Sequence, residues 1–171
     1  MNIPDNVINI GESAFVNCSS FTGNLILPEN LEEFGKHAFR GCKGLSGSLT
    51  VPPKITKIPE NCFSFCSGLN AMLILPESIT TIEDGCFHYS SFKGELNLPK
   101  NVTVIGEEAF SNNNFSGKLI IPESVTVIKD GAFSYNQRLT GIVKLPDELS
   151  SVASETFAGC RHLEGVILPK Y

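Results

Sequence analysis

Apolar and polar residues alternate along this chain in a phrase that returns every 23 or 24 residues. A proline marks each return, and a phenylalanine follows the first seven of these prolines at a fixed offset of eleven residues. The prolines are Pro4, Pro28, Pro52, Pro76, Pro99, Pro122, Pro146 and Pro169, and the phenylalanines are Phe15, Phe39, Phe63, Phe87, Phe110, Phe133 and Phe157. Self-similarity at this period is typical of a solenoid, in which each phrase forms one coil.

Each phrase predicts two short strands followed by a tight turn. Ahead of the proline, every second residue is apolar, as a strand with one buried face requires. Proline ends this strand because it lacks a donor for the ladder. A second extended piece follows, and then a segment such as EDGCF or KDGAF, for which we predict one helical or 3₁₀ turn that directs the phenylalanine inward.

The predicted inward residues form continuous columns from coil to coil. The first strand supplies Leu25/Leu27, Leu49/Val51, Leu73/Leu75, Leu96/Leu98, Leu119/Ile121, Val143/Leu145 and Val166/Leu168, and the second supplies Leu31/Phe34, Ile55/Ile58, Ile79/Ile82, Val102/Ile105, Val125/Ile128 and Leu149/Val152. A glycine precedes most first strands and is expected to adopt a backbone conformation that other residues resist. These glycines are Gly23, Gly47, Gly94, Gly117, Gly141 and Gly165.

A single coil cannot fold alone. Its inward apolar groups contribute roughly 1.5–3 kcal/mol each when fully buried. Ordering each residue of the coil costs roughly 1–2 kcal/mol, so the two totals are comparable at best. Stacking the coils at about 4.8 Å, the spacing of adjacent strands, turns each column into a continuous buried ladder.

The phrases IPESVTVIKDGAF, LPESITTIEDGCF and FRGCKGLSGSLTVP resemble the BspA-like leucine-rich repeats over almost the whole chain. The proline, the Ala-Phe pair and the cysteine or asparagine that follows them carry the resemblance. It implies a right-handed, curved solenoid with a parallel sheet on the concave side. It also implies an extracellular or cell-surface location in a bacterium or parasitic protist, and adhesion to host proteins. No individual binding residue carries over from the family.

The predicted fold class is therefore mainly β with short helical turns: a leucine-rich-repeat solenoid of about seven coils of 23–24 residues. Residues 1–171 are expected to form a single solenoid. Met1 begins at the strand of a coil already under way, and Tyr171 follows closely after another strand. We therefore expect a fragment of a longer array, or a chain whose exposed apolar ends associate end to end.

Composition narrows the possible partners. The net charge is −5, and no basic cluster exists for a nucleic acid to bind. No apolar run approaches the roughly 20 residues that span a bilayer, so we expect no membrane insertion by this segment. A protein ligand is the expected partner, such as a component of the host extracellular matrix.

Residues that often carry catalysis are explained more simply by the repeat. Cys18, Cys42, Cys66 and Cys160 share one column with Asn113 and Asn136, and Cys62 and Cys86 share another with alanines. We expect reduced, buried thiols there, although a disulfide or a metal site remains open as an alternative. The three histidines lie in different columns and are expected to be exposed, and the paired carboxylates are expected to open turns. We therefore predict no enzyme, no cofactor and no metal.

The variable positions of the first strand are the candidate binding residues. They point away from the inward columns, and four isoleucines in an exposed row are more than solubility requires. The candidate protein-binding residues are Asn24, Ile26, Thr50, Met72, Ile74, Glu95, Asn97, Lys118, Ile120, Ile142 and Lys144. The alternative is that isoleucine only reflects strand preference, in which case the chain is a structural spacer or surface-coat element without a ligand.

Overall fold

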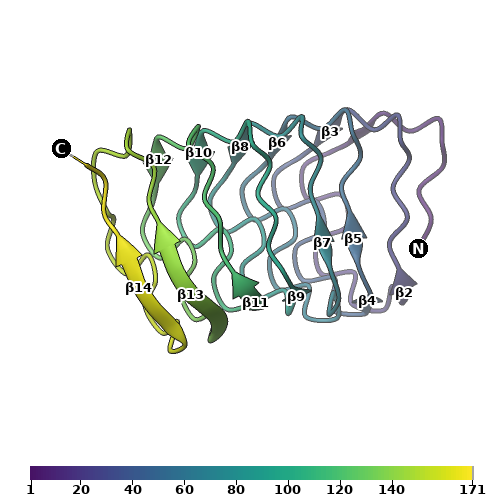
Figure 1. Ribbon diagram of the computed structural model, residues 1–171. Helices are drawn as coiled ribbons and strands as arrows, with labels where there is room; N and C mark the ends of the chain where they lie inside the picture. The colour runs from purple at the N-terminus through teal and green to yellow at the C-terminus, as the bar shows by residue number, and fades with distance from the viewer. Residues whose placement is uncertain (171) are drawn as a thin grey trace.

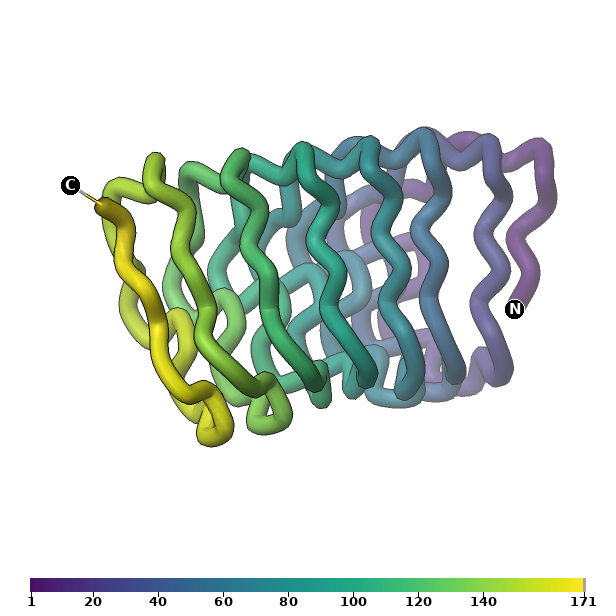
Figure 2. Tube along the Cα trace, in the orientation of Figure 1, coloured from purple at the N-terminus to yellow at the C-terminus, as the bar shows by residue number. Residues whose placement is uncertain are grey.

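Stacked coils run from one end of the molecule to the other in the computed structural model, which describes residues 1–170 (Figure 1). The tube in Figure 2 shows the coils side by side, with the two termini at opposite ends of the stack. The repeat of about 23 residues gives a parallel β solenoid of about seven turns. The predicted fold class is thus confirmed.

Two ladders of parallel strands run along the solenoid, one on each side of the proline column. The strands after the prolines pair as β1–β3 and as β6–β8–β10–β12. Their bounds are β1 Asn9–Ile10, β3 Glu33–Phe34, β6 Lys57–Ile58, β8 Thr81–Ile82, β10 Val104–Ile105 and β12 Val127–Ile128. Each carries one buried apolar residue, such as Ile58 or Ile82, into the core.

The strands before the prolines form the second ladder, and these strands are longer towards the C-terminus. They pair as β2–β4, β5–β7 and β9–β11–β13–β14, always in parallel. Their bounds are β2 Gly23–Asn24, β4 Leu45–Ser46, β5 Leu49–Thr50, β7 Leu73–Ile74, β9 Lys93–Gly94, β11 Asn114–Lys118, β13 Arg138–Lys144 and β14 Leu163–Ile167. In β13 burial alternates strictly along the strand, so every second side chain points outward.

The repeated phenylalanines stack into one column through the core. Neighbouring rings from Phe15 to Phe157 lie 5.2–5.9 Å apart between centroids, with planes within 25° of parallel. Rings on the inner side of the glycine strands, such as Phe92 and Phe115, meet this column edge-on. The predicted central ladder is therefore confirmed.

Some predicted inward positions are wrong. Val152, Val166 and Leu168 are exposed, with 46%, 37% and 54% of their surface accessible. They lie in the last coils that the structure describes, where no later coil covers them. In the interior coils Leu75 and Leu98 are half-buried, because they lie where the strand turns into the proline corner.

The turn that presents the phenylalanine is not the helical or 3₁₀ turn that the sequence predicted, and residues 1–170 contain neither. In each coil the residues two before and two after the phenylalanine adopt positive φ, as His37 (57°) and Gly41 (74°) do around Phe39. A left-handed residue at every fourth position interrupts any helix. The N–H groups of His37, Phe39 and Gly41 instead donate to carbonyl oxygens of the next coil, at 2.8–3.0 Å.

The cysteine and asparagine column does more than fill space. Cys42 and Cys66 donate their thiols to the carbonyl oxygens of Phe15 and Phe39, both at 3.0 Å. Asn113 and Asn136 donate side-chain amides in the same way to Phe87 and Phe110, at 2.7 and 2.8 Å. The predicted buried column is confirmed except at Cys18, which is half-buried. The buried members share the task of pairing a backbone carbonyl that the phenylalanine turn leaves inside the core.

The glycine column adopts the predicted unusual backbone conformation. Gly23, Gly47, Gly94, Gly117 and Gly141 have φ of 74–80°. Gly165 is the exception, since it is absent from the positive-φ set. The register of β13 against β14 shifts between Gly141 and Ile142, just where these strands begin to pair.

Replacing Gly23 by alanine is expected to lower the free energy of unfolding by about 1–2 kcal/mol, because a Cβ is strained at positive φ. A Cβ on Gly23 meets no atom within 4 Å, so backbone strain alone is tested. Gly11→Ala is the matched control, since Gly11 also has open space around it and no positive φ. Urea titration of both variants checks the difference, and equal losses would contradict it.

Candidate protein-binding face

The side chains of the first-strand ladder that point outward form one continuous face along the solenoid. The eleven residues predicted from the sequence are all exposed on it: Asn24, Ile26, Thr50, Met72, Ile74, Glu95, Asn97, Lys118, Ile120, Ile142 and Lys144. They divide into two rows. We name the row that contains Ile26, Ile74 and Ile120 the isoleucine row, and the row that contains Asn24, Met72 and Lys118 the second row.

Parallel pairing sets the order of the isoleucine row. Asn2 pairs with Ile26, Thr50 with Ile74, Asn97 with Ile120 and Lys144 with Ile167. Polar and apolar side chains therefore alternate from coil to coil. The isoleucines are 59%, 44%, 75% and 52% exposed, in chain order. The repeat in the sequence already placed these residues in one row, but the predicted binding face was based on the excess of isoleucine and not on its alternation with polar residues.

The glycine column makes room for the second row. An added Cβ on Gly47 would come within 2.6 Å of the Asn24 amide oxygen, and one on Gly141 within 3.3 Å of the Lys118 side chain. Met72 lies over Gly94 in the same manner. Side chains of the second row therefore lie against the next coil, although Met72 and Ile142 remain as exposed as Ile74 and Ile167.

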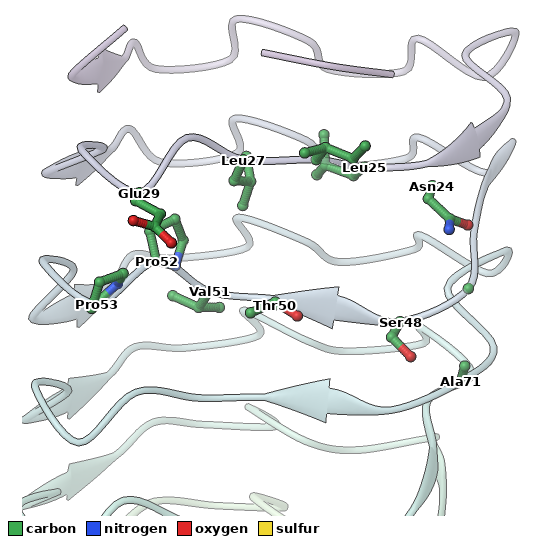
Figure 3. A pocket seen from close by; sticks show the side chains of 12 residues that line it. Asn24, Leu25, Leu27, Glu29, Ser48, Thr50, Val51, Pro52, Pro53 and Ala71 are labelled. Atoms are coloured by element: carbon green, nitrogen blue, oxygen red, sulfur yellow. The ribbon is translucent and has the colours of Figure 1, made fainter. Parts of the chain in front are cut away.

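Two hollows open on this face. The first, of about 620 Å³, lies between the coils of Ile26 and Thr50 and is bounded by Asn24, Glu29 and Pro53 (Figure 3). The second, of about 740 Å³, lies between the coils of Asn97 and Ile120, with Glu95 and Lys118 on its wall. Both are shallow, so they suit side chains of a macromolecule better than a small molecule that must be enclosed.

Carboxylates line the edge of the face that lies next to the prolines. Glu29, Glu77 and Glu123 each follow an isoleucine of the row by three residues, and all three are exposed. Glu123 pairs with Lys144 of the next coil at 2.5 Å, and this hydrogen bond raises the pKa of Lys144. Glu77 accepts the backbone N–H of Lys100 at 3.1 Å.

Charged side chains on the other ladder pair with each other across coils. Lys36 meets Glu60 at 3.0 Å, and Lys129 meets Asp84 at 2.9 Å. These pairs are exposed, where ion pairs contribute little to stability. Within residues 1–170, no group of three or more histidine, cysteine or carboxylate side chains could hold a metal ion. Of the adjacent carboxylates, Glu83 and Asp84 thus pair with Lys57 and Lys129, whereas Glu108 lies beside His88.

The prediction of exposed histidines is wrong for His37 and His88, which are half-buried, and right for His162. His88 meets the rings of Phe65 and Tyr89 edge-on, and these two rings stack on each other. Burial lowers the pKa of His88, and the carboxylate of Glu108, 3.6 Å from Nδ1, only partly opposes that shift. His88 also contacts the hydroxyl of Ser111, but Ser111 is fully buried, so no substrate could reach that oxygen.

All six cysteines are free. Burial raises the pKa of Cys42 to about 11 and that of Cys66 to about 12. Since the thiolate is the reactive form, these thiols are poor nucleophiles near neutral pH. Cys62 and Cys86 are fully buried in the alanine column, as predicted.

No helix among residues 1–170 has both the length and the apolar character that crossing a bilayer requires.

Solved structures of bacterial leucine-rich repeat proteins are similar to this chain. A leucine-rich repeat protein of T. pallidum shares 25% identity at a TM-score of 0.60, over 97% of this chain and 67% of its own. A leucine-rich cell surface protein of Faecalibacterium prausnitzii shares 24% identity at a TM-score of 0.66, and the match covers 98% of this chain and 60% of that protein. A leucine-rich repeat protein of Bacteroides ovatus shares 26% identity at a TM-score of 0.62, and the match covers 98% of this chain and 45% of that protein.

This chain therefore spans between about half and two thirds of these relatives. No curated protein matches it.

The repeat itself identifies the family. The sequence matches the BspA type leucine-rich repeat region, in six copies, over residues 1–116 and 116–171. The stacked phenylalanines, the proline corners and the shared cysteine and asparagine column are the physical counterpart of that match. The chain belongs to the BspA-type leucine-rich repeat family.

Proposed function

We propose that this chain is a non-enzymatic, extracellular protein-binding module of the cell-surface adhesin type. It binds host or partner-cell proteins, such as components of the extracellular matrix, through the face that contains the isoleucine row. The observation that carries the proposal is the exposure of large apolar side chains on one continuous face, since apolar surface left exposed among polar residues favours an interaction site. These side chains are Ile26, Met72, Ile74, Ile120, Ile142 and Ile167. The two hollows would accept side chains of the partner.

The family and the relatives support the location and the absence of catalysis. Leucine-rich repeats are typically non-catalytic binding scaffolds. One similar structure is a cell surface protein of F. prausnitzii, which supports a surface location for this chain too. The reactive groups described above are buried or paired, so they suit a scaffold better than an active site.

Replacing both Ile74 and Ile120 by aspartate is expected to weaken ligand binding at least a hundredfold. The reason is that burying two carboxylates without partners in an interface core costs more than losing two apolar contacts. The ligand comes from a screen of the wild-type chain against immobilised matrix proteins and glycans, and surface plasmon resonance measures the affinities.

The matched control is Val127→Asp, an exposed apolar residue on β12 of the other ladder, where less than a twofold change is expected. Circular dichroism checks that every variant is folded. Wild-type binding that both variants retain would contradict the proposed face. A chain that binds nothing in the screen would favour the structural spacer.

Light scattering of the same samples tests end-to-end association of two copies. The end coils carry partly exposed apolar side chains, such as Ile8 and Leu168, which this association would bury. A mass that rises with concentration is the expected result, and a monomer at all concentrations would contradict it.

A further inference from the structure

The alternation in the isoleucine row fixes a spacing that a ligand must match. Ile26, Ile74, Ile120 and Ile167 lie on every second coil, with Thr50, Asn97 and Lys144 between them. Adjacent strands are about 4.8 Å apart, so successive isoleucines lie about 9.6 Å apart along the solenoid. Each intervening polar side chain offers a hydrogen-bond donor at the midpoint between two apolar anchors.

One regular peptide conformation matches this spacing. A polyproline II helix has three residues per turn and rises about 3.1 Å per residue, so every third side chain returns to the same edge after about 9.3 Å. An α-helix returns after seven residues and about 10.5 Å, and the mismatch accumulates over three intervals. A β-strand covers the distance in three residues but points that third side chain to its opposite face.

The polar groups of the row fit the same ligand. The backbone of a polyproline II helix makes no internal hydrogen bonds, so its carbonyl oxygens remain available as acceptors. Thr50 and Asn97 carry donors between the isoleucines and are exposed, whereas Lys144 already donates to Glu123.

Charge complementarity adds a second requirement. Glu29, Glu77 and Glu123 lie in the same coils as Ile26, Ile74 and Ile120, and so they share the two-coil spacing. The coil of Ile167 carries Lys170 at that position, and the intervening coils carry Asp5, Pro53, Lys100 and Asp147, so negative charge recurs on every second coil only from Glu29 to Glu123. Because the ligand helix has three residues per turn, the residue next to each apolar one lies on a second edge, which would face this carboxylate column. The carboxylates favour basic side chains at that edge.

We propose that the isoleucine row and the column of Glu29, Glu77 and Glu123 bind a peptide segment in the polyproline II conformation that repeats in triplets, with one apolar and one basic side chain in each triplet. This inference rests on the proposed function, because it names the partner of the same face. The apolar side chains contact the isoleucines, and the basic ones pair with Glu29 and Glu77 and displace Lys144 from Glu123.

Fluorescence anisotropy with labelled synthetic peptides tests the proposal. The probes are two twelve-residue peptides, one of four Leu-Arg-Pro triplets and one of four Leu-Pro-Arg triplets, which cover both directions of the ligand chain. At least one is expected to bind tenfold more tightly than a peptide of the same twelve residues with irregular leucine spacing. Replacing every arginine by glutamate is expected to abolish binding.

Variants of the protein test spacing and charge separately. The double variant Thr50→Ile with Ile74→Thr keeps the composition of the face but places two isoleucines on adjacent coils, and an at least fivefold loss is expected. The double variant Glu29→Gln with Glu77→Gln is expected to weaken binding of the arginine peptides at least threefold. This loss is expected to be smaller at high salt, which screens the charges. Asp130→Asn, an exposed carboxylate outside this face, is the control and is expected to change nothing.

Several results would overturn the triplet ligand. They are equal binding of the regular and irregular peptides, tighter binding of an amphipathic helical peptide with leucines seven residues apart, no binding of any peptide, or no response to the isoleucine shift. The proposed function is judged independently by the matrix-protein screen. A protein ligand from that screen that depends on Ile74 and Ile120 would keep the binding face even when the triplet ligand fails.

Discussion

Replacing Phe87 by alanine is expected to lower the free energy of unfolding by about 3–5 kcal/mol. Phe87 is fully buried and stacks on Phe63 and Phe110, with ring centroids 5.9 and 5.6 Å away, and it meets Phe92 edge-on. Removing its ring leaves a cavity in the middle of the phenylalanine column. The flanking coils cannot close on that cavity, because backbone hydrogen bonds fix their separation on both sides of the turn.

The expected loss is a large part of the roughly 5–15 kcal/mol that stabilises an ordinary domain. In a solenoid each coil contacts only its neighbours, so a defect at the centre weakens the coupling between the two halves. We therefore expect a lower urea midpoint together with a smaller m-value, as the halves begin to unfold separately.

Phe65→Ala provides the matched control, since Phe65 is exposed and its contacts, with Tyr89, His88 and Arg40, lie at the surface. It is expected to cost less than about 1 kcal/mol. Equal losses for the two variants would contradict a core built on the phenylalanine column.

Replacing Asn113 by leucine is expected to cost about 2–5 kcal/mol, although leucine has a similar shape. The side-chain amide nitrogen of Asn113 lies 2.7 Å from the carbonyl oxygen of Phe87, and its oxygen accepts the N–H of Phe92 at 3.0 Å. Leucine would leave both backbone groups buried and unpaired. Chemical denaturation measures the loss, and faster hydrogen exchange at the Phe92 amide locates it.

The column itself supplies graded controls. Asn113→Cys keeps a donor for the Phe87 carbonyl but not an acceptor for Phe92, so about half the loss is expected. Asn136→Cys should cost least, because no donor in the described part of the chain reaches the Asn136 side-chain oxygen. Equal losses for the two cysteine variants would contradict the role assigned to the acceptor.

The parts of the fold that depend on side-chain period could be predicted from the sequence. Phe63, Phe87 and Phe110 recur at the period of one coil, and a residue that recurs in register must stack when coils stack. Gly117 and Gly141 likewise indicated positive φ, although both lie inside strands, β11 and β13, and not before them. In each case one residue type carries one physical requirement, so the pattern and the structure agree.

The turn could not be predicted, because its left-handed residues share no chemistry. The position two after the phenylalanine is Gly41, Phe65, Tyr89 and Asn112 in successive coils, and all four have positive φ. Hydrogen bonds to the next coil impose this conformation even on bulky residues, against their local preference. The same turn buries His37 and His88 in part, which explains why their predicted exposure was wrong.

The candidate face was predicted as a set of residues but not as a pattern. Exposure follows from strand alternation, and all eleven residues lie outward as expected. The two-coil order of Ile26, Thr50 and Ile74 has meaning only once parallel pairing places them side by side. What those residues bind stays a prediction, since binding depends on the partner as well as on this surface.

The alternation of the isoleucine row also limits how such an array can change in length. Successive isoleucines of the row are separated by 48, 46 and 47 residues, from position 26 to 74, 120 and 167. Loss or duplication of one coil would leave the core intact. Beyond that point, however, isoleucines would stand on the coils where polar residues would otherwise stand, and the reverse. Gain or loss of two coils would preserve the order of isoleucines and polar residues. The surface therefore repeats in units of two coils, whereas the core repeats in units of one.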